Sequence, residues 1–347
     1  GGIGVRSDML EELGMELPTN LDDFTAFLQA AKDQYDIAPL TANKSSPFIS
    51  TILTAFGMGD AEWYDIDGTY THRIKHPQIA DYLGYLQMLY SEGLMDNDMP
   101  INTADNSKEK FASGNAIACA PLMFWDIPSM VNALSTSNPD CKIEFVTDLA
   151  PDADTQPHHY IMEGAKFVTC ISQNSKNPEH VINWLNILTE PDNFRRTYIG
   201  EEGVSYEIID GEYHPIFEGD DATNFNAYTN SDKLSGFSDP TLAFQMWQAR
   251  ARKTPEMAEA YEAMNSRVDE YEALVSIEAY GKTSPQVQEY ITALNQAFSD
   301  SFLKAIVEGT DPDEAVAAMQ AEWDANGGLE VEAAMQEFYE ANKDFAG

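Results

Sequence analysis

Residues 111–128 read FASGNAIACAPLMFWDIP, and the strand that this stretch predicts decides the fold. Small and apolar side chains alternate from 115 to 121, which is typical of a strand packed inside a tight sheet. The proline that closes this run has no N–H to donate, so we expect the strand to stop there. Phe124, Trp125 and Asp126 would then emerge at the carboxyl end of the strand, where open α/β sheets bind their ligands.

Helices and a hairpin precede this strand. LPTNLDDFTAFLQAAKD predicts a helix whose cap is Thr19, and a second predicted helix ends at Gly93. Between them, Asp67-Gly68 predicts the turn of a hairpin. This alternation indicates that residues 1 to about 150 form an α/β lobe around a mostly parallel sheet.

The composition changes at residues 148–160, DLAPDADTQPHHY, which are rich in Pro and Asp and have no periodicity. We interpret this segment as a crossing between domains. Beyond it, AKFVTCIS predicts a strand, KNPEHVINWLNIL predicts a helix, and Asp210-Gly211 predicts a second hairpin. From about residue 240 onward we expect only helices.

The chain of 347 residues is strongly acidic, with 20 Lys and Arg against 58 Asp and Glu and a net charge of −38. Such a surface repels phosphate backbones, so nucleic-acid binding is not expected. It also disfavours polyanionic ligands, which leaves neutral or cationic small molecules as the natural partners. The apolar fraction of 43% allows a sizeable core, and no apolar run is long enough to cross a membrane.

Three cysteines, Cys119, Cys141 and Cys170, fit no metal-binding spacing. Cys119 and Cys170 stand inside apolar runs, which predicts that both are small buried side chains. An odd count argues against a disulfide framework, although a single bridge stays open.

Five segments, in this order, resemble the family-1 extracellular solute-binding proteins of ABC transporters, the maltose-binding class. They are VRSDMLEELGMELPTNLDDF, FASGNAIACAPLMFW, ISQNSKNPEHVINWLNIL, GEEGVSYEIIDGEYHPIF and EGTDPDEAVAAMQAEWDANGG. The nearest likeness is to the lipoprotein subgroup typical of Gram-positive sugar transporters. The strand-helix units with which that family begins have no counterpart in this sequence.

The resemblance implies an α/β, periplasmic-binding-protein-like two-lobe fold with one lobe incomplete. Residues 1–155 would be the second lobe, and residues 156–347 would be the returning part of the first lobe plus the C-terminal helices. It further implies a monomeric, extracellular lipoprotein that closes by a hinge around a neutral carbohydrate and delivers it to an ABC permease. No catalytic residue, cofactor or metal is expected.

The resemblance also places the ligand contacts. Trp125 would stack on a sugar ring, with Phe124 as the alternative in register, and Asp126 would accept hydrogen bonds from hydroxyls. The loop NKSSPFIS would contribute Ser46 and Phe48, with Asn43 near. The alternative for these residues is ordinary packing, as a core tryptophan or a helix start.

Three further aromatic residues are candidates for the ligand cleft. Trp63 and Tyr64 precede the first hairpin and would form a cleft wall or pack within the strand. Tyr206, with Glu202, lies in the second hairpin, and Trp247 is at least as well explained as a core residue.

Two other functions are alternatives. A peptide- or amino-acid-binding relative needs charged partners for the ligand termini, and Arg6 and Arg73 are the candidates. A glycan-cleaving enzyme needs two carboxylates beside an aromatic cleft, but carboxylates are too numerous here to be informative. His158-His159 and DIDGT suggest metal sites only weakly, because adjacent strand residues point apart and the calcium loop lacks its last acidic ligand.

Overall fold

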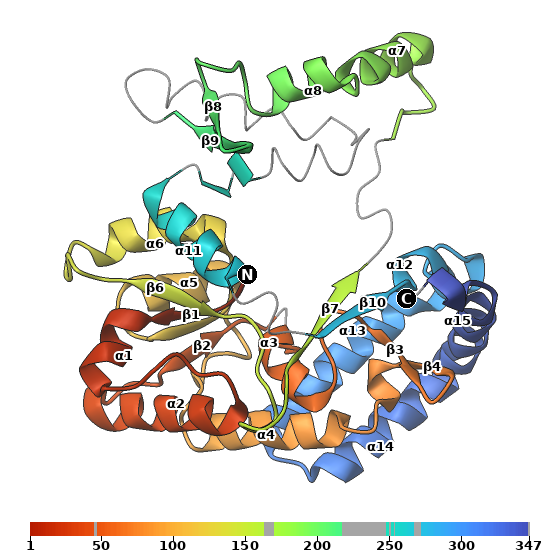
Figure 1. Ribbon diagram of the computed structural model, residues 1–347. Coiled ribbons are helices and arrows are strands. Elements are labelled where there is room, and N and C mark those ends of the chain that lie inside the picture. Colours follow the sequence, from red (N-terminus) through yellow and green to blue (C-terminus); the bar gives the residue numbers. More distant parts are fainter. Residues whose placement is uncertain are drawn as a thin grey trace. The chain divides into compact units, whose positions relative to one another are not determined.

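The computed structural model describes residues 1–44, 47–162, 170–216, 248–249, 251–252, 254–266 and 272–345. The chain divides into two compact units (Figure 1). Unit 1 comprises Gly1–Lys166 and Ser266–Gly347, and unit 2 comprises Phe167–Asn265. Each unit is described by itself.

A four-stranded sheet in the order β2-β5-β1-β6 forms the first layer of unit 1. Its strands are β1 (Gly2–Arg6), β2 (Leu40–Ala42), β5 (Ala118–Leu122) and β6 (Ile143–Val146). β2 and β5 are parallel, but β1 is antiparallel to both β5 and β6, so the expectation of a mostly parallel sheet is wrong. Strand-helix alternation does not fix direction, and here β1 is inserted between two strands that run the opposite way.

The strand that decides the fold extends one residue beyond its predicted end, to Leu122. β2 pairs with β5 only as far as Ala120, so Pro121 lies where no N–H is needed on that side. On the other side the register with β1 shifts between Gly2 and Gly4, which accommodates the irregularity.

The helices of this part of the chain are α1 (Ser7–Leu13), α2 (Leu21–Tyr35), α3 (Ser50–Leu53), α4 (Ile79–Ser91), α5 (Ala104–Ala112) and α6 (Ile127–Leu134) (Figure 1). α1, α3 and α5 contact the sheet, whereas α4 packs on α13 (Pro285–Glu308) and α14 (Pro312–Trp323) of the C-terminal part. The predicted cap of α2 was one residue early. Asn20 caps it instead of Thr19, because its Oδ1 accepts from the N–H of Asp23 at 2.9 Å.

The first hairpin is confirmed as β3 (Trp63–Ile66) and β4 (Thr69–His72). Asp67 and Gly68 both have positive φ, 52° and 83°, as the two central residues of a tight hairpin turn require.

Three long helices complete unit 1: α13 (Pro285–Glu308), α14 (Pro312–Trp323) and α15 (Leu329–Asn342). A short helix, α12 (Glu278–Gly281), precedes them. The expectation of helices alone beyond residue 240 is wrong, because β10 (Glu272–Ser276) pairs in parallel with β7 (His158–Met162).

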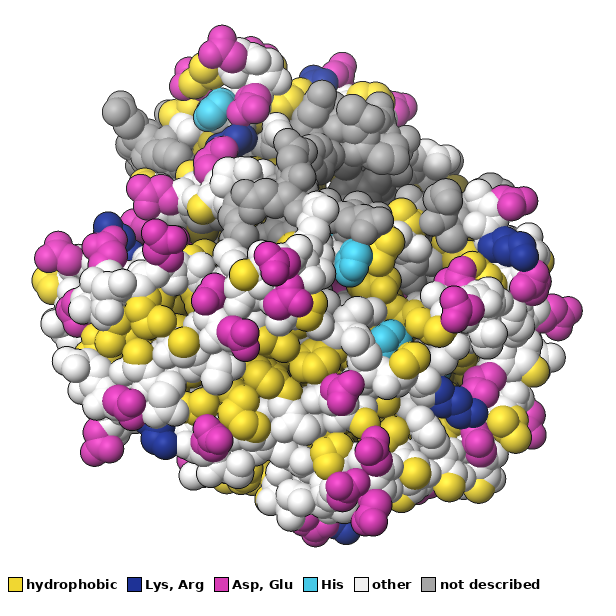
Figure 2. All heavy atoms as spheres, turned by 60° about the horizontal axis from the view of Figure 1, so that its bottom comes forward, with side chains coloured by type: hydrophobic (Ala, Val, Ile, Leu, Met, Phe, Trp, Pro, Cys, Tyr) yellow, Lys and Arg dark blue, Asp and Glu magenta, His cyan; other side chains and the backbone are white. Residues whose placement is uncertain are grey.

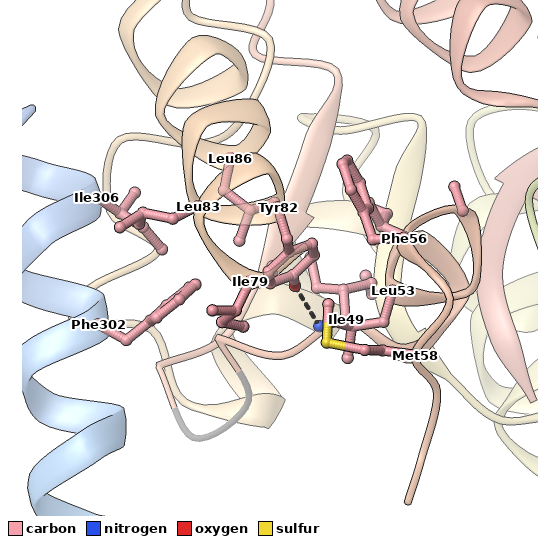
Figure 3. Packing of buried hydrophobic residues seen from close by; sticks show 14 of the residues in the cluster. Ile49, Leu53, Phe56, Met58, Ile79, Tyr82, Leu83, Leu86, Phe302 and Ile306 are labelled. Carbon is pink, nitrogen blue, oxygen red and sulfur yellow. Dashed lines mark hydrogen bonds between the residues drawn. The ribbon is translucent and has the colours of Figure 1, made fainter. Parts of the chain in front are cut away.

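The core of unit 1 lies where α4 meets α13 (Figure 3). Tyr82 packs against Phe302 and Phe56, with ring centroids 5.8 and 5.6 Å apart. Its buried hydroxyl accepts from the N–H of Ile49 at 2.8 Å and donates to the carbonyl of Pro47 at 2.9 Å. The core therefore joins the loop after β2 to both helices.

Unit 2 contains α7 (Pro178–Leu188), α8 (Pro191–Tyr198), α11 (Pro255–Asn265) and a hairpin of β8 (Tyr206–Ile209) with β9 (Glu212–Pro215). The turn at Asp210-Gly211 is confirmed, with φ of 53° and 88°. Cys170 is exposed, so its predicted burial is wrong, whereas Cys119 is buried as expected. The predicted strand AKFVTCIS falls largely outside the described residues.

Acidic side chains are scattered over the face seen in Figure 2 and outnumber the basic ones there. This agrees with the net charge of −38. Among the described residues, no helix combines the length and apolar character that crossing a membrane requires.

Candidate ligand-binding site

The sheet brings the predicted residues after β2 and β5 to one edge. β2 and β5 run in the same direction, and β6 joins them because both β5 and β6 are antiparallel to β1. Their carboxyl ends therefore meet at the same edge. Asn43 follows β2, residues 124–126 follow β5, and Asp148 follows β6.

Trp125 is the exposed aromatic residue at this edge. It lies in the single turn Phe124–Asp126, between β5 and α6, and 49% of it is accessible. Phe124 beneath it is buried, and the two ring centroids lie 5.2 Å apart in an edge-to-face arrangement. The indole is thus supported on one side and open on the other, which is the condition for stacking on a ligand.

Asp126 is largely engaged within the protein. Its Oδ2 accepts from the N–H of Met123 at 3.1 Å, and its Oδ1 accepts from Nζ of Lys108 at 2.9 Å. The ion pair with Lys108 neutralises the carboxylate. Lys108 remains partly accessible, at 27% of its side chain, and adds a cationic donor that sequence reasoning did not single out.

A second polar pair at this edge also escaped sequence reasoning. Nδ1 of His159, on β7, lies 3.1 Å from both carboxylate oxygens of Asp148. This hydrogen bond raises the pKa of His159 above its ordinary value, since the carboxylate favours the imidazolium. No cluster of metal-binding side chains occurs in the part of the chain that the structure describes.

One part of the loop after β2 lies at the carboxyl edge of the sheet, and another part packs in the core. Asn43 is buried next to the strand end. Phe48 packs on α13, with its ring centroid 5.0 Å from Phe298 and 4.9 Å from Phe302. Ser46 lies outside the described residues.

The aromatic residues of the two hairpins are buried. Trp63 is 1% exposed and packs on Tyr70 and His72, at centroid distances of 5.8 and 5.0 Å. Tyr64 is 2% exposed, and its hydroxyl accepts from the N–H of Gly59. Tyr206 is equally buried, against Tyr213 within unit 2. These side chains present no ring face to solvent, and Trp247 is outside the described residues.

A buried polar cluster lies behind the first hairpin. His72 accepts from the N–H of Ile74 through Nδ1, and burial lowers its pKa to about 3, so the imidazole is neutral. Arg73 donates to the carbonyls of Gly59 and Ala61, and its guanidinium lies 4.9 Å from the centre of the Phe48 ring. The cluster joins the hairpin to the core.

No protein-family model matches the chain. An uncharacterised protein from Niallia circulans is 28% identical over 270 residues, which are 76% of this chain and all of that protein. The polygalacturonan/rhamnogalacturonan-binding protein YtcQ of Bacillus subtilis is 22% identical over 59% of this chain and 43% of its own length.

Solved structures match over nearly the whole chain. The alginate-binding protein AlgQ2 has a TM-score of 0.68 at 20% identity, covering 98% of this chain and 71% of that one. An extracellular solute-binding protein from Bifidobacterium longum subsp. infantis gives 0.64 at 16% identity, again over 98% of this chain, and 73% of its own. The N-glycan transport solute-binding protein NgtS of Streptococcus pneumoniae gives 0.55 at 16% identity, over 98% and 72%.

The chain therefore has the same fold as these binding proteins. It spans less than three quarters of each of these solved proteins and less than half of YtcQ. One lobe of the two-lobe fold is accordingly incomplete in these 347 residues, as predicted.

Proposed function

We propose that this protein captures a carbohydrate outside the cell for import by an ABC transporter, closing by a hinge around its ligand. One observation carries the proposal: Trp125 presents a half-exposed ring at the carboxyl edge of the sheet, in a fold shared with the alginate-binding protein AlgQ2 and the N-glycan transport protein NgtS. An exposed indole is unfavourable in water, and the apolar face of a pyranose would cover it.

The division of labour within the chain is part of the same proposal. Residues 1–155 serve as the second lobe, and residues 156–347 as the returning part of the first lobe with the C-terminal helices. Ligand contacts come from Trp125 with Asp126 and Asn43. The buried Phe124, Trp63 and Tyr64 support that edge and the adjoining hairpin. The resemblance implies a position near the cleft in its closed form for Ser46, Phe48 and Tyr206, and the proposal retains it.

The ligand we propose is a neutral sugar or oligosaccharide. The net charge of −38 disfavours polyanions, and Lys108 near Trp125 is already neutralised by Asp126. AlgQ2 and YtcQ are named for acidic polysaccharides, which makes an acidic oligosaccharide the competing ligand. Lys108 would then be released from Asp126 to pair with a uronate.

The peptide-binding alternative finds no support in the two arginines it needs. Arg6 is held by Asp8 through two charge-assisted hydrogen bonds, Nε donating to Oδ1 at 2.7 Å. Arg73 is buried and donates to backbone carbonyls. Both guanidinium groups are thus engaged in the structure of unit 1.

The proposal also covers the oligomeric state, the location and the partner of the protein. The protein would act as a monomeric lipoprotein at the cell surface, deliver its ligand to a permease, and leave that ligand chemically unchanged. The test is calorimetric titration of the full-length natural protein with neutral oligosaccharides and with oligogalacturonates. Tight binding of a neutral glycan, recovered intact by chromatography, is expected. If only oligogalacturonates bind, the ligand is an acidic oligosaccharide and not a neutral one. A cleaved product in molar excess over the protein would show that the protein is a catalyst.

A further inference from the structure

A cavity of about 260 Å³ lies between α13 and α14, within unit 1 and on different elements from the edge that carries Trp125. Tyr290, Phe298 and Trp323 line it; Phe298 and Trp323 are 5% and 2% exposed, so the half-buried Tyr290 is the ring most open to a ligand. Two carboxylates, Glu289 and Glu322, also line it. Since about 150 Å³ is enough to hold benzene, this space suits a small organic molecule.

The wall of the cavity is held by the turn between α14 and α15. Gly327 has φ of 103°, a conformation that glycine adopts readily. A Cβ there would approach the Tyr290 ring to 2.5 Å, and one at Gly328 would approach the Trp323 ring to 2.0 Å. Two glycines thus let the backbone pass close behind both rings, which would otherwise be displaced.

Trp323 is further fixed from two sides. Its ring stacks on His72 at 4.2 Å between centroids, and its Nε1 donates to Oε1 of Glu332 at 2.9 Å. An aromatic ring that is already oriented loses little freedom when a ligand arrives.

The charges around the cavity are negative. The lining contains no Lys, Arg or His side chain, and Glu322 is exposed. Lys75, next to the lining residue Ile74, is held by Asp324 and Glu332 at 2.6 and 2.7 Å. Neither Glu289 nor Glu322 has a basic side chain within ion-pair distance in the described part of the chain. A cation entering the cavity would therefore meet two solvent-exposed carboxylates that lack a basic partner among the described residues, of which Glu289 also accepts a hydrogen bond from the hydroxyl of Tyr290.

We propose that this cavity binds an organic cation with an aromatic or branched apolar body, such as an aryl- or alkylammonium ion. The apolar body fills the space above Leu294 and Met319, and the cationic head lies near Glu289 and Glu322. Aromatic rings attract cations through their negative faces, and the overall charge of −38 adds a favourable field. This site is independent of the proposed sugar site.

Calorimetric titration of the full-length protein with benzyltrimethylammonium chloride tests the proposal, with benzyl alcohol as the neutral comparison. The cation should bind and the alcohol should bind far more weakly. Glu289→Gln and Glu322→Gln should each weaken binding by about two- to fivefold, because each removes one solvent-exposed charge. Glu337→Gln, an exposed carboxylate on α15, is the matched control and should change nothing.

Ala297→Trp should fill the cavity and abolish cation binding while leaving any sugar binding intact. Circular dichroism checks its fold, and if this variant does not fold, the two carboxamide variants decide. Equal binding of cation and alcohol, undiminished binding in Ala297→Trp or in both carboxamide variants, or no binding of the cation to the natural protein would each overturn the proposal.

Discussion

Trp63 and Trp125 differ in what their surroundings leave for a ligand. Both follow or open a short strand in unit 1, and both were candidates for the cleft. Trp63 is 1% exposed between Tyr70 and His72, whereas Trp125 is 49% exposed above Phe124. Protein contacts cover the indole of Trp63, whereas about half of the indole of Trp125 stays accessible to solvent. Only the second can gain apolar contact when a ligand binds.

The difference comes from what each turn is packed against. The hairpin that begins at Trp63 is covered by the C-terminal helices, where the Tyr70 ring stacks on Tyr339 at 4.6 Å. Residues 124–126 instead form a single turn after the carboxyl end of β5, and the chain continues directly into α6. Burial of an aromatic residue is therefore decided by a helix more than 200 residues away along the chain.

The largest effect is expected at Trp63. Trp63→Ala should lower the free energy of unfolding by about 3–5 kcal/mol, because it leaves a cavity among buried rings. Trp125→Ala should lower it by no more than about 0.5 kcal/mol, because the ring is half in water. Urea denaturation of the two variants measures both values. Similar losses in the two variants would remove the distinction between a structural and a ligand-facing tryptophan.

A smaller loss is expected at Tyr82. Tyr82→Phe removes the hydroxyl that accepts from Ile49 and donates to Pro47, which leaves two buried backbone groups unsatisfied. The expected cost is about 1–3 kcal/mol in urea denaturation. Tyr280→Phe is the matched control, since Tyr280 is 52% exposed, and it should be nearly neutral. A neutral Tyr82→Phe would show that the loop after β2 is not held by this hydroxyl.

The same two regions contain histidines whose pKa values shift in opposite directions. Burial lowers the pKa of His72, beside Trp63, to about 3, and the hydrogen bond to Asp148 raises that of His159. In the unfolded chain a histidine titrates near pH 6.5. Because the folded pKa of His72 is lower, its contribution to the free energy of unfolding is present above pH 6.5 and is lost as the pH falls toward 3. Because the folded pKa of His159 is higher, its contribution to the free energy of unfolding is present below pH 6.5 and is lost as the pH rises through that pKa.

Urea midpoints measured across this pH range test these signs. The loss of stability on acidification should be smaller in His72→Gln than in the natural protein. His180→Gln, at an exposed position, should follow the natural profile. In His159→Gln the profile should be altered on the alkaline side instead. If the urea midpoint of His72→Gln falls on acidification as much as that of the natural protein, His72 is not responsible for the loss of stability at low pH.

Local signals in the sequence were sufficient for the hairpins and for most helices. Asp67-Gly68 and Asp210-Gly211 determine their own turns, because the positive φ values involve no distant partner. β10 was missed because a five-residue strand is stabilised by β7, more than 100 residues earlier. The direction of β1 was missed for the same reason, since pairing partners are set by tertiary structure.

The candidate site was predictable only in part. The position of Trp125 after a buried strand was visible in the sequence, and its exposure matches that interpretation. The burial of Trp63 was not visible, because nothing in EWYDIDG shows which helix covers the hairpin. The pairing of Lys108 with Asp126 and of His159 with Asp148 could have been found only from the tertiary structure, in which α5 and β7 bring these side chains together.

Whether Trp125 contacts a bound carbohydrate is decided by the affinity of the Trp125→Ala variant for its ligand. With the full-length protein and whichever glycan it binds, calorimetry should show a loss of about ten- to hundredfold, equivalent to about 1–3 kcal/mol of lost apolar burial. Leu329→Ala removes an equally exposed apolar side chain on α15 and should leave the affinity unchanged. Equal affinity in Trp125→Ala and the natural protein, with the fold intact, would show that Trp125 does not contact the ligand.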